Sequence, residues 1–575
     1  MQKALLALVS LIIWTMKLQV ALGSTYYVAP NKNLDGSTNT LGSDSNSGVS
    51  TSLPFATFDR AWQALYPGDT LFLMDGTYYQ TLAPNVRDGA PNPAIDTQDY
   101  QTYPLDHPER IKNYIRIRAL NDGKAVIDGQ NARMPVLLGY YTQHWIGHYY
   151  LLEGLVAKNS SDQVYHIFSR NVVIRRCSGY NANTRENSHV FTVDSTGGTP
   201  QDPSNILIED CVAGGSGRKM FVAYASYVNI IFRRVFAAWQ EWKSGTSATY
   251  QPCCWPWGDG IEIYNWQQTD LSSYPKLVNS TVENSILYGM YPTYGFSLTP
   301  NQAVTRNNNF LGLMAIQAGM KWNGTPMTWP CPDPDNPSVQ CVQWGSWQSQ
   351  RAGFVFGTSS KPLFVNNRFQ DLFAYGNGGA GLSAGQPGSG WCNGTEPAGT
   401  YPCSRCNPVE TNPLDKCAAG QVTASQPSAN NVLNRVTLVH NGLGNPAPQE
   451  GAGNEVTDFS LSMFDKFGSK SNLYIEGRTG YTDPSKGARL QYRYVNGVLM
   501  DGTNGQSSQP LWPWPMEDRI KSEFATHLLT PASNFSVTST VCEQILKPNG
   551  AVSSCGSSSD TVPPAPPQNM TLQIQ

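Results

Sequence analysis

A short phrase of polar and apolar residues recurs through the middle of the chain. It begins with asparagine, continues with a short apolar stretch and ends with two charged residues, as in NVVIRR from Asn171, NILIED from Asn205 and NIIFRR from Asn229. The spacings are 34 (205 minus 171) and 24 (229 minus 205) residues. A constant strand phrase at irregular spacing is typical of coils that carry loops of variable length. The pattern predicts a solenoid of stacked parallel strands, with the three asparagines at equivalent turns.

The segment before these repeats, residues 26–78, predicts one short helix between two strands. Thr57 is a suitable N-cap for this helix, which we expect over residues 57–66. The apolar positions that follow it fall on one helical face, at Phe58, Ala61, Trp62 and Leu65. A Pro-Gly turn ends the helix, and the apolar run TLFLM then predicts a buried strand.

The order of these segments, YYVAPN, SDSNSG, PFATFDRAWQAL, PGDTLFL and DGTYY, resembles the opening of secreted right-handed parallel β-helix proteins of the pectate-lyase-like kind. The resemblance implies an all-β fold, a right-handed parallel β-helix solenoid with a short N-terminal capping helix and long loop insertions. Such a helix plugs a solenoid end that otherwise exposes apolar core and unpaired strand edges. We expect the β-helix with its two caps to span residues 24–530. A disulfide segment and a Pro-rich tail follow over 531–575.

The first 23 residues read as a signal peptide, with one lysine, a short apolar run and small residues before the expected cut. An uncleaved membrane anchor is the alternative. Charged residues make up 14% of the chain and the net charge is −3, which argues against a nucleic-acid-binding surface. We therefore expect a secreted protein, active as a monomer, that binds neither nucleic acid nor, once its signal is removed, membrane.

Twelve cysteines in an exported chain suggest disulfides. Sequence proximity favours the pairs Cys331–Cys341 and Cys542–Cys555. Cys177 and Cys211 end two copies of the strand phrase, so we expect them on neighbouring coils, as buried free thiols or as a bridge; the free thiols are favoured because cysteine packs well in cores.

Long loops interrupt the repeats, and loops without periodicity are often functional. The segment 240–258 is rich in tryptophan and proline. We expect its rings to line one wall of a glycan-binding groove, at Trp242, Trp255 and Trp257.

The phrase GDGIEIY follows this loop directly. Strict alternation turns Glu262 and Tyr264 away from the core, while Asp259 lies at the turn. The phrase resembles the acidic stretch of polysaccharide lyase family nine, whose carboxylates hold calcium. The resemblance implies a Ca²⁺ site at Asp259 and Glu262 and a substrate contact at Tyr264. Alternatively, Asp259 is only a turn residue and Glu262 only a solvated strand residue.

The phrase GGSGRKMF supplies candidate catalytic bases. A lyase that acts on acidic glycans removes a proton next to a uronate carboxylate, and it needs a base and a positive group. Lys219 is the candidate base, Arg218 a carboxylate clamp, and Lys243 a second base 24 residues further on (243 minus 219). Alternatively, Arg218 and Lys219 are an ordinary basic pair exposed to solvent.

Carboxylates at the ends of two further strands complete the candidate metal ligands, Asp194, Glu209 and Asp210. The same acidic residues can instead pair with nearby arginines, among them Arg233 and Arg234. His189 is the better candidate of two histidines for substrate binding; the other is His166.

Together these features favour a carbohydrate-active protein that binds a polysaccharide. The preferred hypothesis is a polysaccharide lyase that cleaves uronate-containing glycan by calcium-assisted β-elimination. A non-catalytic glycan-binding or surface protein is one alternative, and a glycoside hydrolase or epimerase on the same scaffold is another. A hydrolase needs two carboxylates roughly 5–10 Å apart, whereas a binder needs only an aromatic floor.

Overall fold

The structure is a computed structural model, and it describes the N-terminal cap and most strands of the solenoid. The described residues are 23–66, 68–83, 86–87, 90–91, 114–139, 148–183, 188–194, 204–224, 227–239, 259–265, 276–289, 295–300, 304–318, 352–356, 363–377, 381–384, 430–439, 441, 468–476, 493–495, 498–500, 510–512 and 523. Among them, no helix is long and apolar enough to cross a bilayer. The expected signal peptide and the cysteine pairs Cys331–Cys341 and Cys542–Cys555 lie outside the described residues.

Most of the described strands belong to one parallel sheet, called sheet A here, with 23 strands in the described part of the chain. Its strands are β1 Thr25–Val28, β2 Thr70–Leu73, β3 Gly76–Tyr78, β6 Ile115–Ala119, β7 Ala125–Asp128, β9 His148–Glu153, β10 Leu155–Lys158, β12 Arg170–Arg175, β13 Ser178–Tyr180, β15 Ser204–Glu209, β16 Val212–Gly215, β18 Tyr227–Arg233, β19 Phe236–Trp239, β21 Lys276–Val278, β22 Thr281–Glu283, β23 Ile286–Tyr288, β25 Val304–Arg306, β26 Asn309–Leu311, β27 Met314–Ile316, β29 Leu363–Val365, β30 Arg368–Tyr375, β32 Asn431–Val439 and β33 Gly468–Glu476.

A second parallel sheet, sheet B, contains one strand from each of eight successive coils. Its strands are β8 Val136–Leu138, β11 Tyr165–Ile167, β14 His189–Val193, β17 Lys219–Tyr224, β20 Asp259–Asn265, β24 Phe296–Pro300, β28 Phe354–Phe356 and β31 Leu382–Ala384. The remaining described strands form small antiparallel sheets, β4 Val86–Arg87 with β5 Ala90–Pro91, and β34 Arg493–Val495, β35 Val498–Met500 and β36 Pro510–Trp512.

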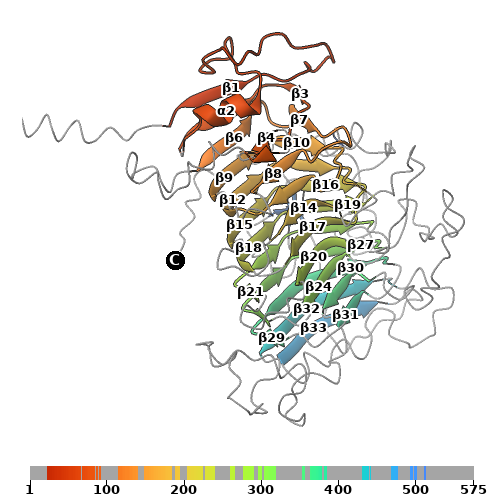
Figure 1. Ribbon diagram of the computed structural model, residues 1–575. Helices are drawn as coiled ribbons and strands as arrows, with labels where there is room; N and C mark the ends of the chain where they lie inside the picture. The colour runs from red at the N-terminus through yellow and green to blue at the C-terminus, as the bar shows by residue number, and fades with distance from the viewer. Residues whose placement is uncertain are drawn as a thin grey trace, which may run out of the picture.

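The strands stack as the coils of a parallel β-helix (Figure 1). Successive coils pair in parallel, for example β12 with β15 and β15 with β18 in sheet A, and β14 with β17 and β17 with β20 in sheet B. Apolar side chains from both sheets meet in one continuous core cluster. The predicted all-β solenoid is therefore confirmed.

The predicted alignment of the repeated asparagines is also confirmed. Val172 pairs with Ile206, and Ile206 with Ile230, so the residues before them, Asn171, Asn205 and Asn229, occupy one position on successive coils. The same position continues along the solenoid with left-handed backbone, φ between 53° and 60°, at Asn229, Asn279, Asn307, Asn366 and Asn430. Asparagine adopts this conformation more readily than other residues with a Cβ, which explains its presence at Asn229 and at the later positions.

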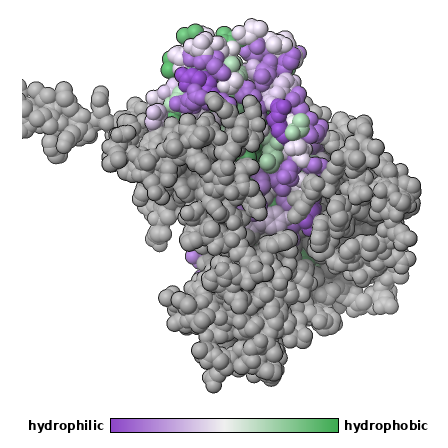
Figure 2. Space-filling view, in the orientation of Figure 1, coloured by the Kyte–Doolittle hydropathy of each residue, from purple (hydrophilic) through white to green (hydrophobic). Residues whose placement is uncertain are grey.

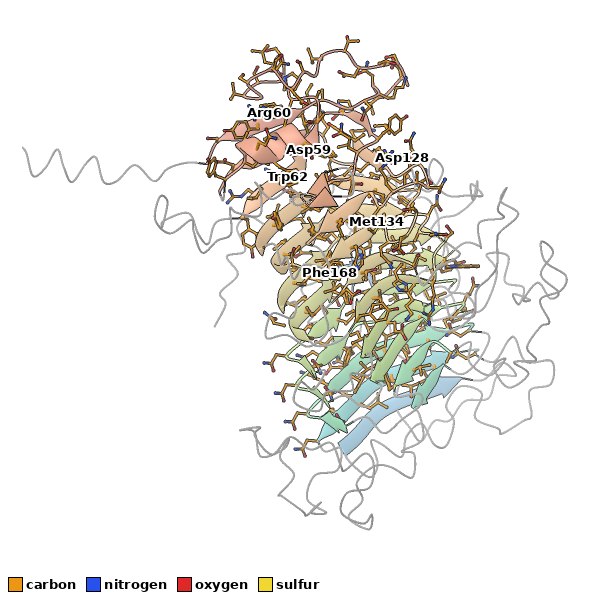
Figure 3. All side chains as sticks on the ribbon, in the orientation of Figure 1. Asp59, Arg60, Trp62, Asp128, Met134 and Phe168 are labelled. Carbon is orange, nitrogen blue, oxygen red and sulfur yellow. The ribbon has the colours of Figure 1, made fainter. Side chains whose placement is uncertain are left out.

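The N-terminal helix forms as the sequence predicts. Helix α2, Phe58–Ala64, begins at Thr57, whose hydroxyl accepts a hydrogen bond from the Arg60 N–H at 3.1 Å. Its buried face stacks Phe58 on Tyr78 at 5.3 Å between ring centroids. The labelled Trp62 faces the first coils, in edge contact with Tyr150 at 6.5 Å (Figure 3). The helix thereby covers the N-terminal end of the core.

The outer surface of this cap is mostly hydrophilic, with scattered apolar residues (Figure 2). The exposed apolar side chains are Leu34, Leu41, Val49 and Leu53. Single exposed apolar residues are normal on a soluble surface, so they indicate no docking site.

The charged pair that ends each strand phrase forms a ladder along sheet A. Arg118 pairs with Glu153 at 2.7 Å, and Glu209 with Arg233 at 3.6 Å. Across the coils, side chains of alternating sign lie in register, in the order Arg118, Glu153, Arg175, Glu209, Arg233 and Glu283. Each charge in this charge ladder therefore has neighbours of the opposite sign.

Two further columns lie inside the coils. Cys177 and Cys211 are buried thiols on neighbouring coils, as the sequence favoured. Nearer the C-terminal end, Asn308, Asn367 and Asn431 form a buried amide ladder, because Asn308 donates its side-chain N–H to Asn367 at 2.9 Å and Asn367 donates to Asn431 at 3.0 Å. Buried polar groups persist in native cores only when they are hydrogen-bonded in this way.

Candidate functional site

Four of the polar side chains on sheet B gather into one hydrogen-bonded cluster, called the sheet B cluster here. They are His189 of β14, Lys219 and Tyr224 of β17, and Glu262 of β20. These three strands are adjacent, because His189 pairs with Lys219 and Val222 with Glu262 in the parallel register. Residues 73 positions apart in sequence (262 minus 189) are thereby brought onto successive coils.

The interior of the same strands fixes this geometry. Phe191 stacks on Tyr165 at 4.3 Å and on Phe221 at 4.8 Å between ring centroids, so three coils share one aromatic column in the core. Ile261 and Ile263 also join the core, which turns the intervening Glu262 to the outer side of sheet B. The strand alternation inferred from GDGIEIY is confirmed for these residues.

The ammonium of Lys219 forms an ion pair with the carboxylate of Glu262. Both side chains are almost completely buried, with exposed fractions of 1% and 2%. Removing two charges from water costs several kcal/mol for each ion, and mutual attraction offsets this cost only in good geometry. A buried Lys–Glu pair on the outer side of a solenoid sheet therefore indicates either a specific structural device or a site of function.

Tyr224 joins this ion pair to a histidine. The hydroxyl oxygen of Tyr224 lies 3.1 Å from the Lys219 Nζ and 2.8 Å from the His189 Nε2. The Lys219 Nζ also lies 4.9 Å from the centre of the Tyr224 ring. Tyr224 is partly exposed, whereas the other three members are buried.

The imidazole of His189 is neutral at neutral pH. Its complete burial, and then the positive charges of Lys219 and Arg218, hold the pKa of His189 well below its ordinary value of 6.5. Its backbone N–H donates to the side-chain oxygen of Gln163 at 2.5 Å, which fixes the start of β14. A neutral imidazole can donate or accept a single proton at Nε2, depending on its tautomer.

The remaining polar residues on this side of sheet B lie one or two coils closer to the N-terminus. His166 and Asp194 approach to 3.4 Å and are both partly exposed. The His166 ring also contacts Phe168, which belongs to a small apolar cluster with Met134; both are labelled in Figure 3. Asp194 directly follows Val193, the register partner of Ala223, so it ends its strand beside Tyr224.

Two of the predicted metal ligands lie on sheet A instead. Glu209 and Asp210 accept hydrogen bonds from Arg234 at 2.5 Å and 2.6 Å. Burial alone would lower the pKa of Arg234, but the hydrogen bonds and charge of Asp210, and next of Glu209, raise it above its ordinary value. These carboxylates are thus neutralised by arginine, which is the alternative that the sequence left open for them.

Several other predicted residues cannot be placed in the site. Trp242, Lys243, Trp255 and Trp257 lie outside the described residues, and Asp259 and Tyr264 are described only as backbone of β20. Within the described part of the chain, His, Cys, Asp and Glu side chains form no group that could hold a metal ion. Glu262 faces an ammonium and Glu209 a guanidinium, so these two carboxylates are already paired with cations.

Sequence reasoning proposed Lys219, His189 and Glu262 for three separate roles, and the structure brings them together. It missed Tyr224, the residue that connects them. A signal was present, because KMFVAY and DGIEIY are copies of one strand phrase. Aligning them places Val222 beside Glu262 and Tyr224 in register with Tyr264.

No protein-family model matches the chain, and no curated protein matches it. Solved structures similar to it include the pectate lyase Pel9A, 14% identical over 90% of this chain and 92% of that chain, with a TM-score of 0.40. A rhamnogalacturonan lyase is 16% identical over 60% of this chain and 82% of that chain, with a TM-score of 0.34. A family PL6 polysaccharide lyase from Pseudopedobacter saltans is 13% identical over 76% of this chain and 96% of that chain, with a TM-score of 0.26. The parallel β-helix that the sequence resemblance predicted is the fold that the two stacked sheets form.

Proposed function

We propose that the protein is a secreted polysaccharide lyase that cleaves uronate-containing glycan by β-elimination at the outer side of sheet B. The observation that carries this proposal is the sheet B cluster. It combines a buried lysine, a neutral histidine and a partly exposed tyrosine on adjacent strands. Ionisable groups held in costly surroundings are more frequent at functional sites than elsewhere.

The reaction class follows from the charges of the cluster. β-Elimination removes the proton next to the uronate carboxylate, and the electron pair forms a carbon–carbon double bond as the bond to the glycosidic oxygen breaks. The step needs a proton acceptor and positive charge near the carboxylate. Lys219 lies beside Tyr224, and the positive charges of Lys219 and Arg218 both act on His189.

The same geometry bears on the alternatives. A hydrolase needs two carboxylates on either side of the scissile bond. Within the described cluster the carboxylate is Glu262, and it is occupied by Lys219. A glycan-binding protein needs no buried Lys–Tyr–His connection, so the lyase explains more of what is described. A polysaccharide substrate, secretion, a monomeric state and calcium dependence are parts of this proposal.

The proposal is tested by the release of unsaturated sugar ends, read by their ultraviolet absorbance. The purified full chain is incubated with polygalacturonate, rhamnogalacturonan, alginate and glucuronan. We expect absorbance from at least one of them, and a loss of about 10²–10³-fold in rate for Lys219→Met. The matched control is Lys158→Met, which removes an amine paired with Asp128 at 3.7 Å on sheet A and leaves the rate unchanged.

Two results would overturn the proposal. Shortened chains without a new double bond would identify a hydrolase. Binding of these glycans without any cleavage, in a preparation shown by circular dichroism to be folded, would leave the binding protein as the function.

A further inference from the structure

Access to solvent separates the members of the sheet B cluster. Lys219 is 1% exposed, Glu262 2% and His189 0%, whereas Tyr224 is partly exposed at the end of β17. A group that exchanges a proton with a polysaccharide must come within hydrogen-bond distance of the sugar. Tyr224 is the member of the cluster that solvent can reach, and the lysine is not.

The Tyr224 oxygen accepts the hydrogen bonds that its two buried neighbours make to it. The Lys219 ammonium can only donate, so the Tyr224 oxygen accepts from it at 3.1 Å. The His189 Nδ1 is buried and has no hydrogen-bond partner within the described residues. An unpaired buried acceptor is tolerated better than an unpaired buried N–H. The imidazole proton is therefore favoured on Nε2, where it points at the Tyr224 oxygen at 2.8 Å.

Two donors thus converge on one phenol oxygen. Hydrogen bonds to the charged form of an acid favour that form. Lys219 places a positive charge 3.1 Å from this oxygen, and Glu262 pairs with the same ammonium. The low pKa of His189 keeps its ring neutral, so it serves as a hydrogen-bond donor and does not carry away the tyrosine proton.

We propose that Tyr224 is the catalytic residue that takes the proton from the sugar and returns it to the leaving oxygen; this inference rests on the proposed lyase function. The Tyr224 phenolate removes the proton next to the uronate carboxylate and becomes a phenol. The electron pair left on carbon forms the double bond as the bond to the glycosidic oxygen breaks. The phenol then gives the same proton to that oxygen, and the phenolate is restored.

In this mechanism the buried residues position and stabilise Tyr224 and do not exchange protons with the sugar. Lys219 and His189 are positioning residues that stabilise the phenolate, and Glu262 positions Lys219. Arg218 supplies further positive charge near His189. No external oxidant or co-reactant is needed, because one proton moves from carbon to oxygen and the phenolate ends as it began.

The test replaces the hydroxyl alone. Tyr224→Phe keeps the ring and is expected to lower kcat by about 10²–10⁴-fold with little change in KM. The matched control is Tyr288→Phe, which removes a hydroxyl that donates to Gln317 at 2.8 Å on sheet A and leaves kcat unchanged. Both variants are checked by circular dichroism and thermal melting.

If Tyr224→Phe does not fold, the donor to its oxygen is varied instead. His189→Leu removes this donor and should lower kcat at least tenfold, while His189→Gln restores an N–H and should recover part of the loss. A wild-type enzyme that releases unsaturated ends, with Tyr224→Phe within threefold of it, would overturn this inference alone. If the His189 variants are used instead, equal rates for His189→Leu and wild type would also overturn this inference alone. A wild type that releases no unsaturated ends would overturn both this inference and the proposed function.

Discussion

The Lys219–Glu262 pair allows stability and activity to be separated in one experiment. Both side chains are buried on adjacent strands, so the change of either leaves an isolated buried charge. The set comprises Lys219→Met, Glu262→Met and the double variant, because methionine has nearly the volume of lysine and adapts its shape to the space.

The expected magnitudes follow from this burial. Breaking a buried ion pair from one side costs about 3–5 kcal/mol, because the remaining charge stays unpaired. Replacing both partners by apolar residues is neutral or stabilising by about 1–4 kcal/mol. Lys158→Met is the control. Its pair with Asp128 is more exposed, 21% and 16%, so the change should cost at most about 1 kcal/mol.

Urea unfolding followed by far-ultraviolet circular dichroism gives the free energies, and the lyase assay is run on the same samples. We expect both single variants to be strongly destabilised, and the double variant to regain stability without regaining activity. The reasoning is refuted if Lys219→Met costs no more than Lys158→Met, or if the two single losses simply add in the double variant. Recovery of activity together with stability would show that the pair has a structural role only.

Three further predictions follow from the described contacts. Because the pKa of His189 is lowered in the folded chain, the unfolded chain binds a proton that the folded chain does not. The free energy of unfolding therefore falls as the pH drops from 6.5 to the lowered pKa, by at most about 1.4 kcal/mol per pH unit. Urea unfolding between pH 4 and 8 should show a flatter pH profile for His189→Gln than for the wild type. Asn367→Ala leaves the backbone and side-chain N–H groups of Asn308 without their acceptor and should cost at least about 2 kcal/mol in urea, whereas Asn366→Gly, at the neighbouring left-handed position, should cost less than about 1 kcal/mol. The predicted calcium dependence is checked by chelation with EGTA, which should abolish release of unsaturated ends until calcium is returned; an unchanged rate would remove calcium from the proposal.

Much of the fold was readable because local signals agreed with the global arrangement. The asparagine phrase combines a left-handed corner, an apolar strand and a charged pair, and each part constrains the same coil. Helix α2 carries its own N-cap at Thr57 and one apolar face. Such consistency between local and long-range preferences is what makes a sequence informative about its structure.

The site was harder to predict from the sequence, because its residues meet only through the strand register, and long insertions separate these strands in the sequence. Lys219 and Glu262 meet only because β17 and β20 are adjacent, although β18 and β19 of sheet A lie between them in sequence. Tyr224 gives no motif of its own, since an outward tyrosine near a strand end is common. Its importance arises from the side chains that converge on its oxygen, and no spacing within one strand contains that information.

The charge ladder on sheet A limits how this protein can change in length. Removing one coil, from Asn205 to Val228, would bring Arg175 directly beside Arg233, and two like charges would face each other across the sheet. Removing two successive coils would instead restore contact between opposite charges, since Arg175 would then lie beside Glu283. In this part of the solenoid, gain or loss of coils should therefore be tolerated in even numbers. Evolution would then add or remove two coils together and not a single coil.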